Sequence, residues 1–340
     1  MSAHRYTVLD GMRGAAALSV LAYHADYGFN LPSTMPHGYL AVDFFFALSG
    51  FVLAQTYDQR IAHGMRLSSF MGRRLVRLYP MILAGALLGA ASFSPGWQGS
   101  RLELLTLNLS SFILLPLGLL FGEATFPTNI PIWSLFFEFA ANAVFFTSAR
   151  RGKKHAGKSL IFLCTTAAIL AAVAHLAGGL GAVGVNSAPS FLAGFVRVAF
   201  SFGAGVAISR FALHRHFPAV VGWVPLLLLV ILMAQSVHGW WYDILCTVFC
   251  FPLLLRLGAR ATSSAKQDRL WLFAGALSYP VYVIQEPVLR AIFRLLGPGS
   301  QPALLGILAT MGLAALLLRI YDEPLRARLA LSGALLKSGT

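Results

Sequence analysis

The chain has 340 residues, of which 57% are hydrophobic and only 11% are charged, whereas soluble domains carry about 25% charged residues. A soluble fold of this length could not cover its apolar surface, so the composition predicts an integral membrane protein. The formal net charge of +14 does not indicate nucleic-acid binding, because the basic residues lie between apolar runs and not on one amphipathic face.

Apolar runs close to the roughly twenty residues that a spanning helix needs recur along the whole chain. The first run has no small-residue cleavage site, so we expect a retained helix and not a removed signal peptide. We predict an all-α fold, a polytopic bundle of ten transmembrane helices in a single domain over residues 1–335 without a soluble extension. The predicted spans are 12–30, 38–56, 77–95, 130–149, 159–177, 190–210, 219–236, 239–256, 270–293 and 302–320.

The basic residues in the segments that connect the apolar runs, here called joints, predict the orientation of the chain in the membrane. Positively charged joints normally stay cytoplasmic, and ten spans place the joints 58–79, 150–158, 210–216 and 256–269 on one side together with both termini. We therefore expect a multi-pass protein of the cell inner (plasma) membrane with both termini in the cytoplasm. Arg290 and Arg294, at the outer end of the ninth span, are the exception.

The first span carries two ionisable residues, which are functional candidates because burying them in a membrane is costly. Arg13 and His24 are eleven residues apart, which places them on nearly the same helix face about 16 Å apart along the axis. Histidine exchanges a proton near neutral pH, as a general base or a transient nucleophile. The alternative is a packed histidine bonded to a neighbouring helix.

The second span and the joint after it contribute further polar candidates. Ser49 and Gly50 follow three phenylalanines, and the pair either lines a site or permits close helix packing. Arg74 and Arg77 share one helical face, and arginine suits bidentate phosphate binding. The alternative for these arginines is simple anchoring at the cytoplasmic surface.

The run 104–121 is long enough to be an eleventh span, but a crossing there would move the basic joint 150–158 to the outside. We therefore predict that it is re-entrant or interfacial. Pro116 and Gly118, with Pro127 and Pro131 beyond them, are typical of an irregular segment buried among other helices.

The fourth span contains Ser134, Glu138 and Asn142 at intervals of four, a polar stripe on an apolar helix. Glu138 could orient a histidine, act as an acid or base, or bind a hydroxylated substrate. It could equally pair with an arginine such as Arg197 for structural reasons.

The ninth span places Ser278, Tyr282 and Gln285 on one face, with Pro280 able to loosen the helix around a cavity; the alternative is a polar seam between helices. The three cysteines lie in apolar runs without metal-ligand partners, so we expect packing roles and no metal site. They are Cys164, Cys246 and Cys250.

Taken in order, these motifs resemble the family 3 membrane acyltransferases. The resemblance spans nearly the whole chain and rests on Arg13 with His24, GYLAVDFFFALSGF (38–51), RLVRLYP (74–80), WSLFFE (133–138), SYPVYVIQ (278–285) and EPLR (323–326). It implies transfer of an acyl group, commonly acetyl from acetyl-CoA, to a hydroxyl of an extracytoplasmic or lipid-linked carbohydrate. Acetyl-CoA would be a co-substrate, and no tightly bound cofactor is expected.

The resemblance also implies roles for the candidates. His24 would be the catalytic base or an acyl relay, assisted by Glu138, and the donor phosphates would be held at the cytoplasmic mouth by Arg13, Arg74 and Arg77. Many relatives have histidine where this chain has Gln285, which cannot shuttle a proton, so we expect no second catalytic histidine there. The expected substrate-binding residues are Trp133, Ser134, Ser49, Tyr282 and Gln285.

Two other classes of protein fit the same composition. A secondary transporter would bury charges in a similar bundle, but it usually shows internal repeats, and none is evident here. A structural partner protein would use these polar groups only to hold helices together and would tolerate His24→Ala.

Overall fold

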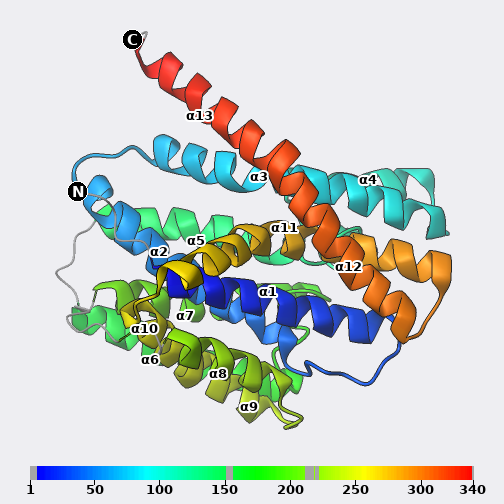
Figure 1. Cartoon of the computed structure of the whole chain (residues 1–340), viewed down its shortest axis with the longest axis horizontal. Helices are drawn as coiled ribbons and strands as arrows, with labels where there is room; N and C mark the ends of the chain where they lie inside the picture. The colour runs from blue at the N-terminus through cyan, green and yellow to red at the C-terminus, as the bar shows by residue number, and fades with distance from the viewer. Residues whose placement is uncertain (1–5, 151–155, 211–217, 219–221, 339–340) are drawn as a thin grey trace.

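The computed structural model describes residues 6–150, 156–210, 218 and 222–338. The regular elements in these ranges are helices, which confirms the predicted all-α class (Figure 1). The α-helices are α1 (Thr7–Gly28), α2 (Ala41–Ala62), α3 (Leu67–Phe93), α4 (Arg101–Ile113), α5 (Ile132–Arg150), α6 (Ala156–Ala177), α7 (Ala188–Arg210), α8 (Trp223–Ala234), α9 (Trp240–Ile244), α10 (Phe251–Arg260), α11 (Ala265–Leu296), α12 (Ser300–Leu317) and α13 (Glu323–Ser338). Short 3-10 helices are η1 (Gly38–Leu40), η2 (Ser94–Gly96) and η3 (Leu117–Phe121), and π-helices join α9 to α10 (η5, Leu245–Cys250) and α12 to α13 (η6, Leu318–Asp322).

Over its described residues, each predicted span coincides largely with helix, and several helices, such as α3 and α11, extend beyond the apolar run. The start of the seventh predicted span, 219–221, lies outside the described residues, and α8 is shorter than that span. Within the described ranges, seven helical stretches are long and apolar enough to cross a membrane: η1–α2, α3 with η2, α5, α6, α7, α9–α10 and α12–α13. Helix α8 is apolar but only 12 residues long. The protein is therefore a multi-pass helical membrane protein, and its orientation in the membrane remains a prediction.

Two of the more polar helices, α1 and α11, lie side by side in the middle of the bundle and run parallel (Figure 1). Small residues allow the close approach: a side chain at Gly14 would collide with Ala274. Further along, the rings of Phe29 and Phe293 meet at 5.6 Å. Arg13 and His24 of α1 are half-buried in this arrangement, whereas Arg269 and Arg294 near the two ends of α11 are exposed.

Helices α2 and α7 also pack closely. Gly50 lies against the backbone of Phe202, and Gly205 lies against the backbone of Ala47, so a side chain at either glycine would clash. This contact supports the close-packing interpretation for Gly50, because small residues let membrane helices approach.

The segment after α3 folds into short pieces and not into a span. Helix α4 has 13 residues, about 20 Å of helix, which is shorter than the roughly 30 Å hydrocarbon core. It begins with a capping box between Ser100 and Glu103, and Tyr79 of α3 donates a hydrogen bond to the Phe112 carbonyl (2.9 Å). Asn129 then ties the buried return segment to α11 through the Val283 carbonyl (2.9 Å). This arrangement agrees with the predicted re-entrant or interfacial segment.

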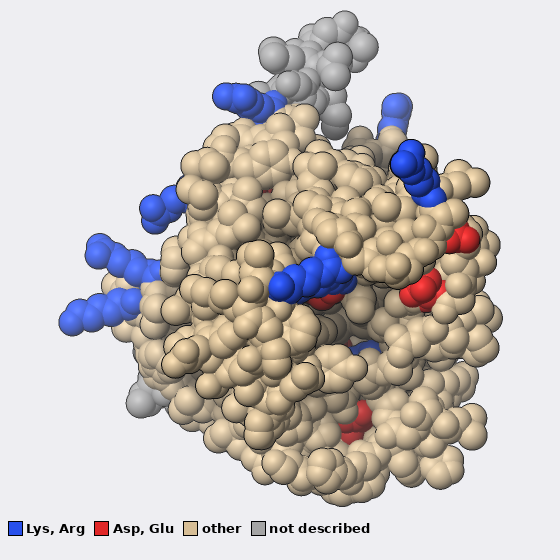
Figure 2. All heavy atoms as spheres, turned by 90° about the vertical axis from the view of Figure 1, so that its right-hand side faces the viewer, with Lys and Arg blue, Asp and Glu red and all other residues tan. Residues whose placement is uncertain are grey.

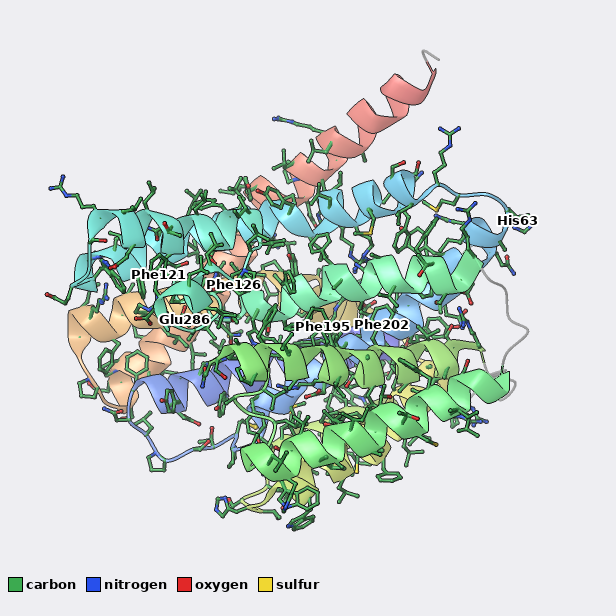
Figure 3. The ribbon with its side chains drawn as sticks, turned by 180° about the vertical axis from the view of Figure 1, so that it is seen from behind. His63, Phe121, Phe126, Phe195, Phe202 and Glu286 are labelled. Atoms are coloured by element: carbon green, nitrogen blue, oxygen red, sulfur yellow. The ribbon has the colours of Figure 1, made fainter. Side chains whose placement is uncertain are left out.

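The bundle has two unlike ends. We call the end with the α2–α3 and α10–α11 connections the basic end, and the end with the α1–α2, α6–α7 and α11–α12 connections the opposite end. His63 marks the basic end, whereas Phe121, Phe126 and Glu286 lie toward the opposite end (Figure 3). Figure 2 views the opposite end and shows a hollow near its centre with charged side chains inside.

The two arginines that do not fit the predicted orientation are held at the opposite end by contacts to neighbouring segments. Arg290 donates to the carbonyls of Thr128 (3.0 Å) and Pro127 (3.1 Å) and pairs with Glu286. Arg294 donates to the Ser92 carbonyl. These side chains fasten the end of α11 to the neighbouring segments, so their position does not require a different topology.

Candidate active site

A cavity of about 350 Å³ lies among α1, α2, α3, α5, α11 and the α12–α13 junction, in the basic half of the bundle. Seven of the predicted site residues line it, although they come from distant parts of the sequence. The ionisable and hydroxyl-bearing residues of its lining are Arg13, Ser49, Arg74, Arg77, Ser134, Glu138, Ser278, Tyr279, Tyr282, Asp322, Glu323 and Arg326.

Glu138 is held in the wall of this cavity by two helices. Its Oε1 accepts hydrogen bonds from Arg74 Nη2 (2.5 Å) and Ser49 Oγ (2.9 Å). Arg74 is only 4% exposed, so its charge needs the carboxylate as a partner. Arg74 Nε is buried without a hydrogen-bond partner among the described residues. The pair therefore retains unused hydrogen-bonding capacity beside the cavity.

Arg197, the structural partner considered for Glu138, binds a different carboxylate. It donates from Nε and Nη2 to Asp43 (3.0 and 2.6 Å) and from Nη1 to the Leu180 carbonyl (2.8 Å). The pairing of Glu138 with Arg197 is therefore wrong, because Asp43 of α2 takes that guanidinium and the arginine partner of Glu138 is Arg74.

The mouth-side cations come from three helices. Arg13 of α1 donates to the Gly275 carbonyl (2.6 Å) and to Asp10 (2.9 Å). Arg77 of α3 is exposed, and Arg326 of α13 pairs with Asp322 (2.7 Å). Together with Arg74 they give four arginines against three carboxylates in the lining, an environment that suits an anionic ligand.

The deep end of the cavity is formed by Ser134 and Tyr282, whose hydroxyl oxygens are 2.8 Å apart. The Phe45 ring packs edge-on against Tyr282 at 5.6 Å. Ser134 and Glu138 thus line the same cavity as the donor-binding candidates.

Two predicted substrate-binding residues lie outside the lining. Trp133 is buried with its ring 5.3 Å from the Arg197 guanidinium, a cation–π contact. Gln285 is fully buried and donates to the Tyr282 carbonyl (3.2 Å), and its amide oxygen has no hydrogen-bond partner in the part of the chain that the structure describes. Their roles toward substrate remain predictions.

His24 does not line the cavity either. The contacts of Gly14 with Ala274 and of Phe29 with Phe293 place it at about the level of Gln285 on α11, just beyond Tyr282. Its ring contacts Tyr23 at 5.2 Å, and no hydrogen bond to it is found among the described residues. The alternative of a histidine bonded to a neighbouring helix is therefore not what the structure shows, and its catalytic role stays a prediction.

Sequence reasoning missed Asp322, Tyr279 and Arg326 as lining residues. A signal was present, because Asp322 and Glu323 stand at the end of an apolar run, where ionisable groups are costly. The π-helix η6 ends at Asp322, and such irregular turns often occur at functional sites. One Asp322 oxygen is buried without a hydrogen-bond partner among the described residues.

The described residues contain no group of three or more His, Cys, Asp or Glu side chains that could hold a metal ion. Cys246 is buried and Cys164 is exposed, and both are free thiols, as is Cys250.

Comparisons with known proteins agree with this architecture. The chain is similar to "Protein 2 in picA locus" of Rhizobium radiobacter, with 35% identity over 186 residues, which is 50% of this chain and 94% of that protein. No solved structure matches significantly. The model of the acyltransferase domain of family 3 matches residues 6–319, which contain the cavity-lining residues up to α12. The chain therefore belongs to acyltransferase family 3 and is a membrane acyltransferase.

Proposed function

We propose that this acyltransferase moves an acyl group, acetyl being the first expectation, from acyl-CoA to a hydroxyl of an extracytoplasmic or lipid-linked carbohydrate. The observation that carries the proposal is the cavity in the basic half, which gathers four arginines from α1, α3 and α13 inside a membrane bundle. A donor with several phosphates matches such a site, because arginine binds phosphate through bidentate charge-assisted hydrogen bonds.

The donor contacts divide among the arginines. Arg74 is committed to Glu138 and is almost completely buried, so Arg77, Arg13 and Arg326 are the better phosphate ligands. Acyl-CoA is a cytoplasmic compound, and the positive-inside rule places the basic end in the cytoplasm. The phosphates would bind at the mouth, and the thioester would reach toward Ser134 and Tyr282.

His24 is proposed to act on the reacting groups beyond Tyr282. In direct transfer it takes the proton of the acceptor hydroxyl, whose oxygen attacks the thioester carbonyl; the C–S bond breaks, and the CoA thiolate leaves and is protonated. In the relay form the His24 nitrogen attacks first and the thiolate leaves, after which the hydroxyl attacks the acyl-imidazole. Both routes use the pair of electrons on an unprotonated imidazole nitrogen.

The test is transfer of radiolabelled acetyl from acetyl-CoA to glycan in membranes that contain wild type, His24→Ala or His63→Ala at matched protein levels. His63 is a suitable control because it is exposed at the basic end, and among the described residues its ring bonds to the Gln59 carbonyl at the end of the adjoining helix α2.

We expect labelled glycan with wild type and His63→Ala and none with His24→Ala. Equal labelling in all three samples would contradict the role of His24. Absence of labelling in all three would contradict the acetyl donor or the carbohydrate acceptor.

A further inference from the structure

A second cavity, of about 420 Å³, lies at the opposite end of the bundle. The α1–α2 connection, the end of α6 and the start of α9 enclose it. Most of its lining is aromatic or polar, contributed by Tyr23, Tyr27, Ser33, His37, Tyr39, His238 and Asp243. Leu31, Pro36, Gly178 and Gly239 complete the lining.

One wall of this cavity is fixed by a saturated hydrogen-bond network. Asp243, which is 1% exposed, accepts from the Tyr39 hydroxyl (2.8 Å) and the Leu180 backbone N–H (2.7 Å), and its Oδ1 lies 3.1 Å from His37 Nδ1. His37 Nε2 donates to the Val237 carbonyl (2.7 Å). The network joins three chain connections, so this wall is preformed and its buried groups have little capacity left for a ligand.

The rest of the lining has unused hydrogen-bonding groups. Over the described residues, the side chains of Tyr23, Tyr27, Ser33 and His238 make no hydrogen bond. Tyr27 is 80% exposed at the rim, so its ring presents an open face. These groups offer hydroxyl and imidazole donors and acceptors next to flat apolar surfaces, the combination that recognises a sugar ring.

The charge of this cavity distinguishes it from the first. None of the described residues that line it is lysine or arginine, and its carboxylate is paired with His37. An anionic ligand therefore has no cation to bind. Tyrosines at a membrane surface can also serve as interfacial anchors, but anchoring requires neither a cavity nor a buried network behind the rings.

The second cavity lies next to the predicted catalytic histidine. Tyr23 forms part of its lining, and the same ring contacts His24 at 5.2 Å and Tyr39 at 5.5 Å. Helix α1 thus carries Arg13 in the first cavity and Tyr23 and Tyr27 in the second, and His24 stands between Tyr23 and Tyr27 in the sequence.

We propose that the second cavity binds a neutral sugar of the acceptor, with the sugar ring against Tyr27 and Tyr23 and a hydroxyl directed toward His24. This inference rests on the proposed function, since it assigns the acceptor side of the same reaction. It also separates donor from acceptor along α1, with the anionic donor at the basic end and the uncharged acceptor at the opposite end.

The test measures equilibrium binding to the full-length protein in nanodiscs of neutral lipid. The probes are short neutral oligosaccharides of glucose, galactose, mannose and N-acetylglucosamine, with sodium phosphate as the anionic probe. Tyr27→Ala is the informative variant, because so exposed a side chain is dispensable for folding. Trp241→Ala is the matched control, since Trp241 is 51% exposed at the same end and does not line the cavity.

We expect at least one neutral oligosaccharide to bind wild type and the Trp241 variant equally and the Tyr27 variant about tenfold more weakly. The proposal is overturned if no oligosaccharide binds, if phosphate binds better than every sugar, or if Tyr27→Ala leaves the affinity unchanged. Coenzyme A binding to the same preparation separates the two proposals. If sugars bind and coenzyme A does not, the donor assignment of the first cavity is refuted. If coenzyme A binds and sugars do not, the sugar site in the second cavity is refuted.

Discussion

Two buried arginine–carboxylate pairs sit in different halves of this bundle and have different surroundings. Arg197 and Asp43 are both about 1% exposed, and further bonds from the guanidinium to backbone carbonyls and from Ser201 to Asp43 complete the group. Arg74 and Glu138 face a cavity, and Arg74 Nε has no hydrogen-bond partner among the described residues.

This difference in hydrogen bonding distinguishes a buried ion pair with a structural role from one that can take part in binding. A saturated pair has no capacity for a ligand, and its value is to fix α7 against α2 and the α6–α7 connection. A pair with a spare donor beside a cavity can donate a hydrogen bond to a ligand atom. In a membrane both arrangements are costly, so the unsaturated pair is the better indicator of a binding site.

The largest effect is expected from Arg197→Met, which leaves Asp43 buried without a partner. We expect a loss of about 3–5 kcal/mol in unfolding free energy, measured by detergent-induced unfolding. Arg210→Met is the control, because Arg210 on the same helix pairs with Asp58 in a more exposed setting, where an ion pair contributes about 0–1 kcal/mol. Recovery of stability on adding Asp43→Leu should follow, and equal losses in the Arg197 and Arg210 variants would refute the structural assignment.

Arg74→Met should instead affect activity more than stability. Glu138 loses its charged partner but can be hydrated from the cavity, so we expect a loss of about 1–3 kcal/mol in unfolding free energy and roughly a hundredfold loss of acyl transfer. Arg73→Met is the control, since Arg73 is the exposed preceding residue and does not line the cavity. An active Arg74 variant with full kcat would show that the pair has no role in the reaction.

Arg77→Met tests whether the cavity beside Arg74 and Glu138 binds the phosphates of the acyl donor. Loss of one phosphate contact is expected to raise the KM for acyl-CoA roughly tenfold with kcat little changed. The increase should shrink at high salt, because an exposed cation is screened. A change confined to kcat would place Arg77 elsewhere in the mechanism.

The smallest effect is expected from Ser49→Ala. It removes one of the two hydrogen bonds to Glu138, which is worth about 1 kcal/mol. Transfer rates should fall severalfold, and the unfolding free energy should fall by no more than about 1 kcal/mol. Unchanged rates in this variant would mean that Arg74 alone positions the carboxylate.

The helices and the membrane class could be predicted because apolar run length and the placement of basic joints follow directly from the cost of moving charge into lipid. The partner of each buried charge could not be predicted from the sequence. Spacing indicated that Ser134 and Glu138 share a helix face, but whether Glu138 meets Arg74 or Arg197 depends on which helices are neighbours. Asp322 was missed for a related reason, since only the packing of the α12–α13 junction brings it to the cavity.

The parallel packing of α1 and α11 also bears on how the chain is assembled. Helix α1 is the first of these helices to leave the ribosome, and its close partner follows more than two hundred residues later. Until α11 arrives, Arg13 lacks the Gly275 carbonyl and the surface around Gly14 is uncovered. Completion of the bundle therefore waits until α11 has been made, and a chain that stops before α11 would leave the first helix without its partner.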